Sequence, residues 1–477
     1  MRDLIVSFII IGAMPLCFRR PFIGLLMFTL LAYMRLQDLT WGFARGIRWS
    51  YFISMIMFAG FLMSRGDKRM FVPDMRSWIM LALVGLVGLS LLFQPGDINW
   101  QWDFQRYIEY AKIITIALFT TAVVKHRDHL RMLMLVIALS FGFYGVKGGL
   151  QGILSGGSSR IIEGPGGMIS DNNDFAMALC MGLPLLFVLG MSEKRDNVRK
   201  VLLAMVPLTA ITIVMTYSRG AFLSLVCLSS VLIWRSRNRV AGFTIMGLVG
   251  MAGALAVPKD YVERLGTIVE HEDDASARGR LNAWRVAGNM IAANPFFGVG
   301  FDKFQGNYRF YDFVGKNEMY ADTGKKVAHN SYLQIWAECG TPTFLLYLTL
   351  IALTFMDIWR IRKIARHRYN ASWILSYATG FEATMTAFVV GSMFLNRAHF
   401  DLFYHVVAIV MMFSIIARRE MEDEVAYPQR TGGARGPVRS VHPSGFGHRP
   451  PVVDGFANSP AAAALGPAPA ARKFGGA

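Results

Sequence analysis

Apolar runs long enough to cross a lipid bilayer recur through most of this 477-residue chain. A transmembrane helix needs about 20 predominantly apolar residues. Hydrophobic residues make up 54% of the sequence and charged residues only 17%, whereas a soluble protein carries roughly 25% charged residues. The pattern excludes a set of soluble domains. It predicts an all-α, polytopic integral membrane protein.

We predict about 12 transmembrane helices from these runs. Residues 4–34 contain two short apolar stretches interrupted by Phe18-Arg19-Arg20-Pro21. This segment could be a hairpin or a broken element, and we favour a single spanning element. The remaining predicted spans are 51–63, 77–94, 111–124, 131–149, 173–190, 201–217, 220–234, 240–257, 338–357, 371–395 and 400–417.

The net charge of +17 comes from short basic clusters between the apolar runs. Scattered clusters of this kind favour membrane orientation over nucleic-acid binding, because cytoplasmic loops are enriched in Lys and Arg. The clusters fall on alternate loops, so we expect those loops and the N-terminus to face the cytoplasm. The clusters are Arg65–Arg76, Lys125–Arg131, Lys194–Lys200, Arg235–Arg239, Arg360–Arg368 and Arg418-Arg419.

Two long segments depart from the pattern of spans and short loops. Residues 258–337 form an outer loop of about 80 residues, and loops of that length are usually functional. Residues 418–477 are rich in Pro, Gly and Ala, which predicts a disordered cytoplasmic tail. The expected organisation is therefore N-terminal helices over 1–257, the loop over 258–337, C-terminal helices over 338–417, and the tail.

We predict a helix over Ser276–Ala293 inside the outer loop, ended by Asn294-Pro295. Its apolar stripe would contain Ala277, Leu281, Trp284, Gly288 and Ile291, which repeat at helical spacing. Arg280 falls at the edge of this stripe. We therefore expect Arg280 to point toward the membrane-embedded part more readily than Arg278 or Arg285.

Sequence motifs for several kinds of chemistry are absent. The four cysteines are far apart and no Cys/His spacing suits a metal, so we expect neither a disulfide framework nor a metal site. The sequence contains no Walker motif, no dinucleotide-binding glycine fingerprint and no HExxH. Chemistry on the outer face would also lack ATP. We therefore expect no cofactor, and a pre-activated substrate such as a lipid pyrophosphate.

One histidine stands apart from the other eight. His329 lies in Val327-Ala328-His329-Asn330-Ser331, where the outer loop returns to the membrane. Imidazole has a pKa suited to a general base near neutral pH. The alternative is a histidine that only caps or packs at the start of the next helix.

Several isolated cations lie on the same predicted side as His329. Arg219 stands between two spans in Tyr217-Ser218-Arg219-Gly220, a position where an arginine needs a partner. Guanidinium groups suit bidentate contacts to phosphate. Each could instead be an interfacial arginine. The other candidates for binding pyrophosphate or glycan are Arg160, Arg264, Arg278, Arg280 and, more weakly, Lys147.

Three motifs occur in an order that resembles the O-antigen ligase/polymerase superfamily. They are Tyr217–Ala221, Asn294–Gly300 and Ala328–Leu333. The N-terminal part is similar to a subgroup described as O-glycosylation ligases of exosortase-linked systems, through Thr40–Ala44, Gly145–Gly149 and Gly164–Asp174. The resemblance covers roughly residues 1–417.

The resemblance implies a GT-C-like glycosyltransferase of the bacterial inner membrane that works on the periplasmic face without metal or ATP. The implied donor is a glycan linked to undecaprenyl pyrophosphate, and the implied acceptor is lipid A–core oligosaccharide. By position, His329 matches the catalytic histidine of the family and Arg219 its essential arginine. Arg280 falls in the phosphate-binding set.

Other functions remain open from the sequence. A polymerase of glycan repeats and a protein O-oligosaccharyltransferase would use the same donor chemistry. A lipid-linked glycan flippase would show pseudo-repeated halves and charges at mid-membrane, whereas the notable charges here cluster on the outer side. A purely structural membrane protein is the simplest alternative.

Overall fold

A computed structural model describes residues 2–65, 68–96, 98–256, 279–313, 326–368 and 371–430. The described chain is almost entirely helical, apart from one two-stranded antiparallel hairpin. The candidate residues Arg264 and Arg278 lie outside these ranges.

Six of the described helices are long and apolar enough to span a membrane, and four shorter ones are also apolar. These helices indicate a multi-pass membrane protein, while the count of 12 spans stays a prediction. The elements before the hairpin are α1 (Arg2–Arg19), α2 (Pro21–Tyr33), η1 (Leu36–Leu39), α3 (Phe43–Gly46), α4 (Trp49–Met63), α5 (Met75–Leu92), α6 (Trp100–Val123) and α7 (Arg127–Leu154). They are followed by β1 (Glu163–Gly166), β2 (Ile169–Asp171), α8 (Asn172–Ser192), α9 (Asp196–Met215), α10 (Arg219–Trp234), α11 (Arg239–Ala256), α13 (Phe304–Tyr311), α14 (Ser331–Ala365), α15 (Ser372–Gly391) and α16 (Asp401–Arg430).

The first two helices form an antiparallel hairpin beside α4. Asp3 accepts hydrogen bonds from the backbone N–H groups of Gly42 and Ala44, at 3.0 and 3.2 Å, near the start of α4. At the opposite end the carbonyl of Phe18 lies directly against Gly60. Residues 4–34 therefore form two helices, and the prediction that they cross the membrane as a single element stays untested. Pro21 at the first position of α2 starts a second helix, because its ring suits a helix N-terminus and lacks only an N–H that would be unpaired there.

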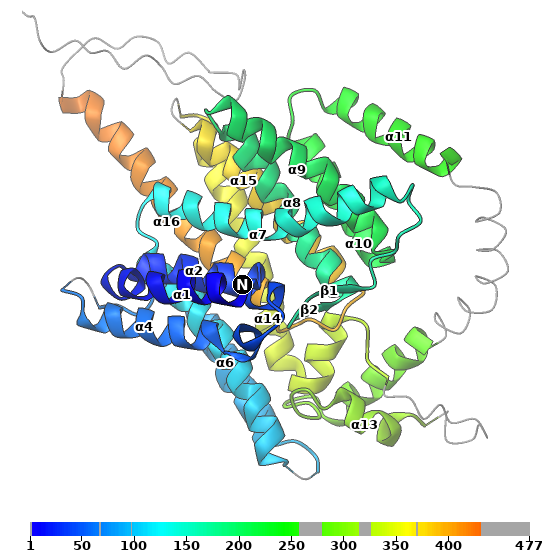
Figure 1. The fold of residues 1–477 in the computed structure, drawn as a ribbon. Coiled ribbons are helices and arrows are strands. Elements are labelled where there is room, and N and C mark those ends of the chain that lie inside the picture. Colours follow the sequence, from blue (N-terminus) through cyan, green and yellow to red (C-terminus); the bar gives the residue numbers. More distant parts are fainter. Residues whose placement is uncertain are drawn as a thin grey trace, which may run out of the picture.

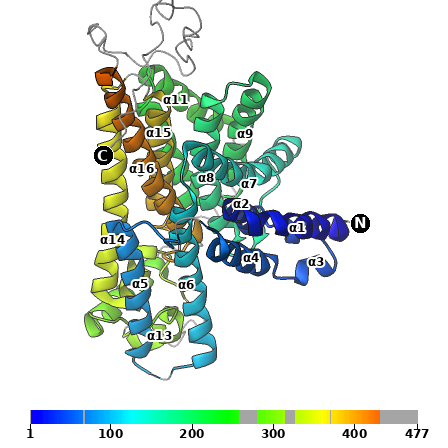
Figure 2. The same ribbon diagram turned by 90° about the vertical axis from the view of Figure 1, so that its left-hand side faces the viewer.

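The helices are arranged in two groups. Figure 1 shows α7, α8, α9, α10 and α15 close together, and α8 packs against α7, α9, α10 and α15. Figure 2 shows α5, α6 and α14 running side by side, with the stack of α1, α2 and α4 projecting to one side. Of the 21 residues of α8, 16 are buried, so α8 forms the centre of the first group.

The segment before α14 and the break within it build one compact unit. Gly340 has φ +79° and ψ 175°, which interrupts the helix. Backbone N–H groups of Val299 and Gly300 donate to the carbonyls of Ala337 and Glu338, both at 2.9 Å, and Thr341 N–H donates to Pro295 O at 2.8 Å. The Asn294–Gly300 motif therefore supplies partners for backbone groups that the broken helix leaves unpaired.

Two helix boundaries differ from those expected from the sequence. α14 begins at Ser331, before the predicted span at 338, because its first turns pack against the outer segment and not against lipid. α16 continues to Arg430, past the expected start of the tail at 418. Residues 431–477 lie outside the described part of the chain.

Residues 279–293 are helical and end at Asn294, in agreement with the predicted helix from 279 onward. The predicted stripe is wrong. Leu281 is 62% and Trp284 37% exposed, whereas the buried face consists of Ala283, Val286, Ala287 and Met290. Small alanines allow this face to approach α13 and α14 closely, so the larger side chains lie outside.

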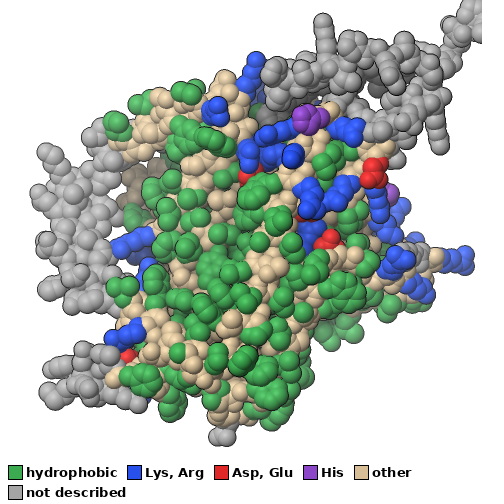
Figure 3. Space-filling model, turned by 180° about the vertical axis from the view of Figure 1, so that it is seen from behind, with side chains coloured by type: hydrophobic (Ala, Val, Ile, Leu, Met, Phe, Trp, Pro, Cys, Tyr) green, Lys and Arg blue, Asp and Glu red, His purple; other side chains and the backbone are tan. Residues whose placement is uncertain are grey.

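The surface combines a broad apolar area with basic residues gathered at one edge. Figure 3 shows hydrophobic side chains over most of one face and Lys and Arg side chains grouped along its upper right border. This distribution agrees with the one expected of a protein that spans a bilayer.

Candidate functional site

His329 has a strained backbone directly before α14. Its φ is +46°, in the left-handed region that non-glycine residues seldom adopt. Asn330 follows as the N-cap, and its side-chain oxygen accepts from the N–H groups of Tyr332 and Leu333 at 3.0 and 3.1 Å. On the other side, Trp284 Nε1 donates to the carbonyl of Ala328 at 2.9 Å. The histidine is therefore held from both sides while remaining exposed.

Arg280 is the charged neighbour that most affects this histidine. Burial by surrounding protein lowers the pKa of His329 from its usual value, and the Arg280 cation lowers it further, while Asp171 acts in the opposite direction. Arg280 precedes the buried Ala283 and Ala287 by three and seven residues, so it lies on the packed face of its helix. The sequence predicted that Arg280 would be directed inward, although through the wrong stripe.

The β1–β2 hairpin brings Asp171 to the same place. Asp171 is the N-cap of α8 and accepts from Asn173 N–H at 2.8 Å. Figure 1 shows the hairpin between α10 and α14. At its turn, a Cβ on Gly167 would lie 2.1 Å from a guanidinium nitrogen of Arg35, so only glycine leaves room for that side chain. Arg35 itself is paired with Asp38 at 2.5 Å.

Arg219 is the first residue of α10, next to the start of α8. Asn172 Nδ2 donates to Thr216 O at 3.0 Å, which ties the two helix starts together. Tyr217 has φ +56°, and the Ser218 side chain caps α10 by accepting from Ala221 N–H at 3.3 Å. Arg219 is exposed at this turn.

Arg160 reaches the same turn from the loop after α7. Its guanidinium carbon lies 5.7 Å from the ring centroid of Tyr217, a cation–π distance. Ile161 N–H also donates to Met215 O at 3.0 Å, which holds the loop against the end of α9.

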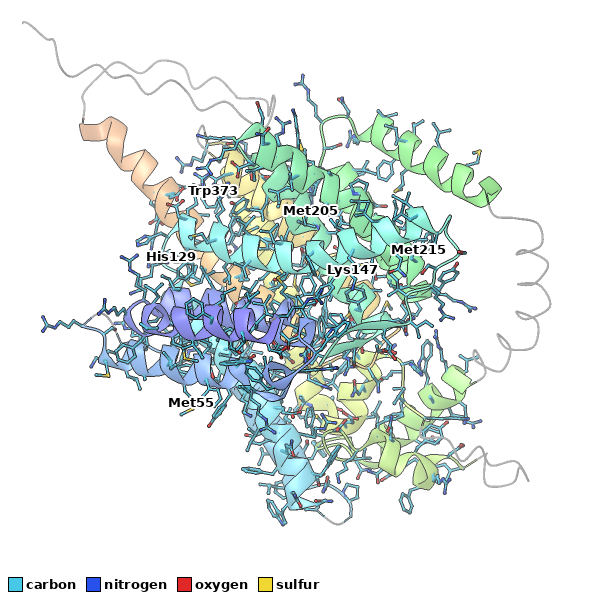
Figure 4. The ribbon with its side chains drawn as sticks, in the orientation of Figure 1. Met55, His129, Lys147, Met205, Met215 and Trp373 are labelled. Carbon is cyan, nitrogen blue, oxygen red and sulfur yellow. The ribbon has the colours of Figure 1, made fainter. Side chains whose placement is uncertain are left out.

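The other cationic candidates are less well connected. Lys147 is exposed on α7 (Figure 4), and among the described residues no hydrogen bond or ion pair joins it to His329, Arg219 or Arg280. Arg264 and Arg278 fall outside the described ranges, so their assignment stays a prediction.

Arg397 and Asp174 form an ion pair at the candidate site. This pair was not predicted from the sequence. Arg397 Nη2 donates to Asp174 Oδ2 at 2.5 Å, and the backbone N–H of Arg397 donates to Ser331 Oγ at 2.8 Å. Ser331 Oγ in turn donates to Leu395 O at 2.7 Å. The segment after α15 therefore joins the first turn of α8 to the first turn of α14. Burial lowers the pKa of Arg397, but the hydrogen bond and charge of Asp174 outweigh it and raise the pKa, so Arg397 stays charged.

The sequence contains only a weak signal for the Arg397–Asp174 pair. Asn172-Asn173-Asp174 before an apolar run is a helix-start pattern, and Arg397 follows an apolar run. Neither feature shows that the two side chains, 223 residues apart, form an ion pair.

The starts of α8, α10 and α14 thus meet in one region. Each helix start is capped, by Asp171, Ser218 and Asn330 respectively. A helix N-terminus carries partial positive charge and favours anions. Three such ends, together with Arg219, Arg280 and Arg160, give a region suited to a multiply charged anion beside an imidazole.

The described residues include no group of three or more His, Cys, Asp or Glu side chains placed to hold a metal ion. Independence from metal and ATP stays a prediction.

Comparison with known families bears on this arrangement. Residues 203–348 match the family model described as O-Antigen ligase. The matched range contains Arg219, Arg280 and His329, and it supports the O-antigen ligase/polymerase superfamily with its glycosyltransferase-type activity. Residues 1–194 match a family of unknown function, DUF5935, which covers α1 through α8 and the β hairpin. No curated protein matches the chain. The predicted link to exosortase systems stays a prediction.

Proposed function

We propose that this protein is an inverting glycosyltransferase that ligates O-antigen glycan from undecaprenyl pyrophosphate to lipid A–core oligosaccharide. We place the reaction on the periplasmic face of the bacterial inner membrane. The observation that carries the proposal is the position of His329, directly before α14 and within electrostatic range of Arg280 and Asp171. The O-antigen ligase family match over the same residues supports it.

In this mechanism neutral His329 accepts the proton of an acceptor sugar hydroxyl. The hydroxyl oxygen attacks the anomeric carbon of the donor from the side opposite the pyrophosphate. A new C–O bond forms, the bond to pyrophosphate breaks with inversion, and undecaprenyl pyrophosphate leaves. The proton on His329 is then lost to solvent. The lowered pKa of His329 keeps the imidazole neutral near pH 7 and so available as a base.

The arginines stabilise the charge that grows on the leaving group. The candidates are Arg280, within electrostatic range of His329, Arg219 at the start of α10, and Arg160, stacked on Tyr217 two residues before Arg219. Fixed cations and helix N-termini need no reorganisation as the bond breaks, which makes this electrostatic contribution large. A carboxylate at Asp171 would oppose a second anion but supports the imidazolium that forms during proton transfer.

The same base and cations would serve a repeat-unit polymerase or a protein O-oligosaccharyltransferase, which differ only in acceptor. A transporter would need none of this catalytic arrangement. The acceptor assay below separates these functions.

The test is a reconstituted reaction with purified protein, lipid-pyrophosphate-linked glycan and separate acceptors: lipid A–core, a second donor molecule, or an acceptor protein. We expect glycan on lipid A–core. His329→Ala should lower the rate by about 10²–10⁴-fold with unchanged folding by circular dichroism. Arg309→Ala, on the far helix α13, is a matched control on the same outer segment. Ligation by His329→Ala at the wild-type rate would contradict the mechanism, and transfer only to the second donor would make the protein a polymerase.

A further inference from the structure

A second cavity lies apart from the residues assigned to the reaction. It has a volume of about 1270 Å³ and is enclosed by α1, α2, α4, α6 and the start of α16. This exceeds the roughly 300–1,000 Å³ of ordinary small-molecule pockets. Figure 2 shows that α1, α2 and α4 project from the long helices, and the cavity is lined by residues of both groups.

The lining of the cavity changes along its length. Apolar residues from within the helices line much of the cavity, including Met14, Phe58 and Ile116, and Lys112 also lines it from within α6. Residues from the outer ends are polar or charged: Tyr33 ends α2, Arg48 precedes α4 and Asp401 begins α16. A cavity that is apolar inside and polar at its outer end matches the shape of a membrane lipid.

One buried polar group in the lining has an unused hydrogen-bonding atom. His405 is 3% exposed, and its Nδ1 is 3.1 Å from the hydroxyl of Tyr33. Its Nε2 has no hydrogen-bond partner among the described residues. A buried polar atom is costly without a partner, so a ligand headgroup or hydroxyl at this point would satisfy it. Arg48 and Lys112 also line the cavity and are exposed, which favours an anionic headgroup.

The cavity is linked to the candidate site by charged residues around Asp401, which lines it. Asp401 lies within electrostatic range of both Arg397 and Arg35. Arg397 is paired with Asp174 in the first turn of α8, and Arg35 lies against the β1–β2 turn that precedes Asp171. A lipid in the cavity would therefore be connected to the candidate site through Arg397 and Arg35 and not through the Arg160–Tyr217 turn.

We propose that this cavity binds the hydrocarbon chain of the acceptor, an anionic lipid, with its phosphate beside Arg48 and Lys112. This inference rests on the proposed glycosyl transfer. Donor and acceptor are both anchored in the membrane and must reach one base at the same time. The donor pyrophosphate needs the Arg160, Arg219 and Arg280 side, which leaves this cavity, on the other side of Arg397, for the second lipid.

The first experiment measures binding without any transfer. The full-length protein in nanodiscs is irradiated with hexadecyl phosphate that carries a diazirine in its chain, and the labelled peptides are identified by mass spectrometry. We expect labelling in Trp49–Met63 and in residues 112–117. Lipid A–core should compete with the probe. Labelling elsewhere would overturn the site, and competition by the lipid-linked donor alone would overturn its assignment to the acceptor.

Matched substitutions test the two parts of the cavity. Ala117 is 1% exposed and lines its inner part, so Ala117→Trp should fill the space that the chain needs and lower labelling about tenfold. Lys112→Glu should lower labelling by a similar factor by repelling the phosphate. Val226→Trp, on an exposed apolar face of α10, and Lys200→Glu, on exposed α9, are the controls and should label normally. If Ala117→Trp fails to fold, Lys112→Glu still decides the outcome.

The kinetic experiment separates this inference from the proposed function. Lys112→Glu should raise the KM for lipid A–core about tenfold and leave the KM for the donor unchanged. A rise confined to the donor KM would contradict the inference. His329→Ala should retain full probe labelling, so loss of transfer by that variant tests the reaction and leaves the lipid site to be judged from labelling alone.

Discussion

At His329 two constraints act on one residue. The left-handed backbone costs of order 1–3 kcal/mol for a non-glycine residue, and the Asn330 cap and the Trp284–Ala328 hydrogen bond hold it in place. The side chain is thereby kept next to Arg280 and away from the helix that begins two residues later. Tyr217 has the same kind of conformation one residue before the Ser218 cap of α10. Strained residues at both helix starts fit a site in which position matters more than local stability.

The pKa of His329 gives a prediction about pH. Arg280 disfavours the imidazolium, so Arg280→Met should raise the pKa of His329, and Asp171→Asn, which removes an opposing anion, should lower it. The base works in its neutral form. The acidic limb of the kcat/KM profile should therefore move to higher pH in Arg280→Met and to lower pH in Asp171→Asn. If the acidic limb moved in the same direction in both variants, His329 would be excluded as the titrating base.

The Arg397–Asp174 pair predicts a coupled effect on stability. Arg397→Gln leaves a carboxylate with 7% side-chain exposure without its partner, and loss of one member of a buried pair costs about 3–5 kcal/mol, less here because Arg397 is a quarter exposed. Thermal unfolding in detergent should show a lower Tm. The Arg397→Gln/Asp174→Asn double variant should recover part of the loss. A double variant less stable than either single one would show that the pair is not the main interaction.

At the scale of elements, the helix break at Gly340 joins the outer segment to the membrane helices. A Cβ at Gly340 would lie 2.1 Å from the carbonyl oxygen of Phe296, and its φ of +79° is also unfavourable for other residues. Gly340→Ala should therefore displace the Asn294–Gly300 segment and lower both Tm and transfer activity. Gly306→Ala, where a Cβ would meet no atom within 4 Å, is the control and should be close to wild type.

The elements also show what the sequence could and could not predict. Apolar runs predicted the helices from α4 to α11 and the region of His329 and Arg219, because each depends on local composition. The early start of α14 was not predicted, since Gln334 and Glu338 suggest a loop, yet both are buried against the outer segment. The stripe of residues 279–293 was misplaced because two sets of apolar residues repeat at helical spacing on this helix, and the set with Ala283 and Ala287 is the buried one. Small alanines form the actual contact.

Long-range pairs were beyond the reach of sequence patterns. Arg397 and Asp174, or Arg35 and the Gly166-Gly167 turn, come together only when several helices are packed. The sequence therefore suggested His329 and its cations as candidates, but not the Arg397–Asp174 ion pair.

At the scale of the whole molecule, several arginines of the basic clusters that we predict to face the cytoplasm also form ion pairs between helices. Arg76 and Arg418 both pair with Asp357, each at 2.8 Å. Arg235 and Arg362 both pair with Glu382, at 2.5 and 2.9 Å. These ion pairs join α5, α10, α14, α15 and α16 at the end of the molecule opposite His329. Basic residues there both set orientation and link helices.

The α1–α2 hairpin leads to a prediction of topology. Asp3 is bonded next to the start of α4, and Arg35, just after α2, lies against the hairpin turn of the candidate site. If α1 and α2 cross the membrane as a hairpin, we expect the N-terminus to lie on the same side as the candidate site and Arg19-Arg20 on the other side. This orientation is opposite to the cytoplasmic N-terminus that we expected from the sequence.

Cysteine accessibility tests this orientation. In a variant without the four native cysteines, Arg2→Cys should react with a membrane-impermeant maleimide in intact spheroplasts, as should Ser158→Cys in the loop that holds Arg160. Ser236→Cys, in the basic segment after α10, should react only after the membrane is permeabilised. All three residues are exposed, so a difference in labelling reports the side of the membrane. Labelling of Arg2→Cys together with Ser236→Cys, and apart from Ser158→Cys, would mean that α1 and α2 do not form a membrane-spanning hairpin.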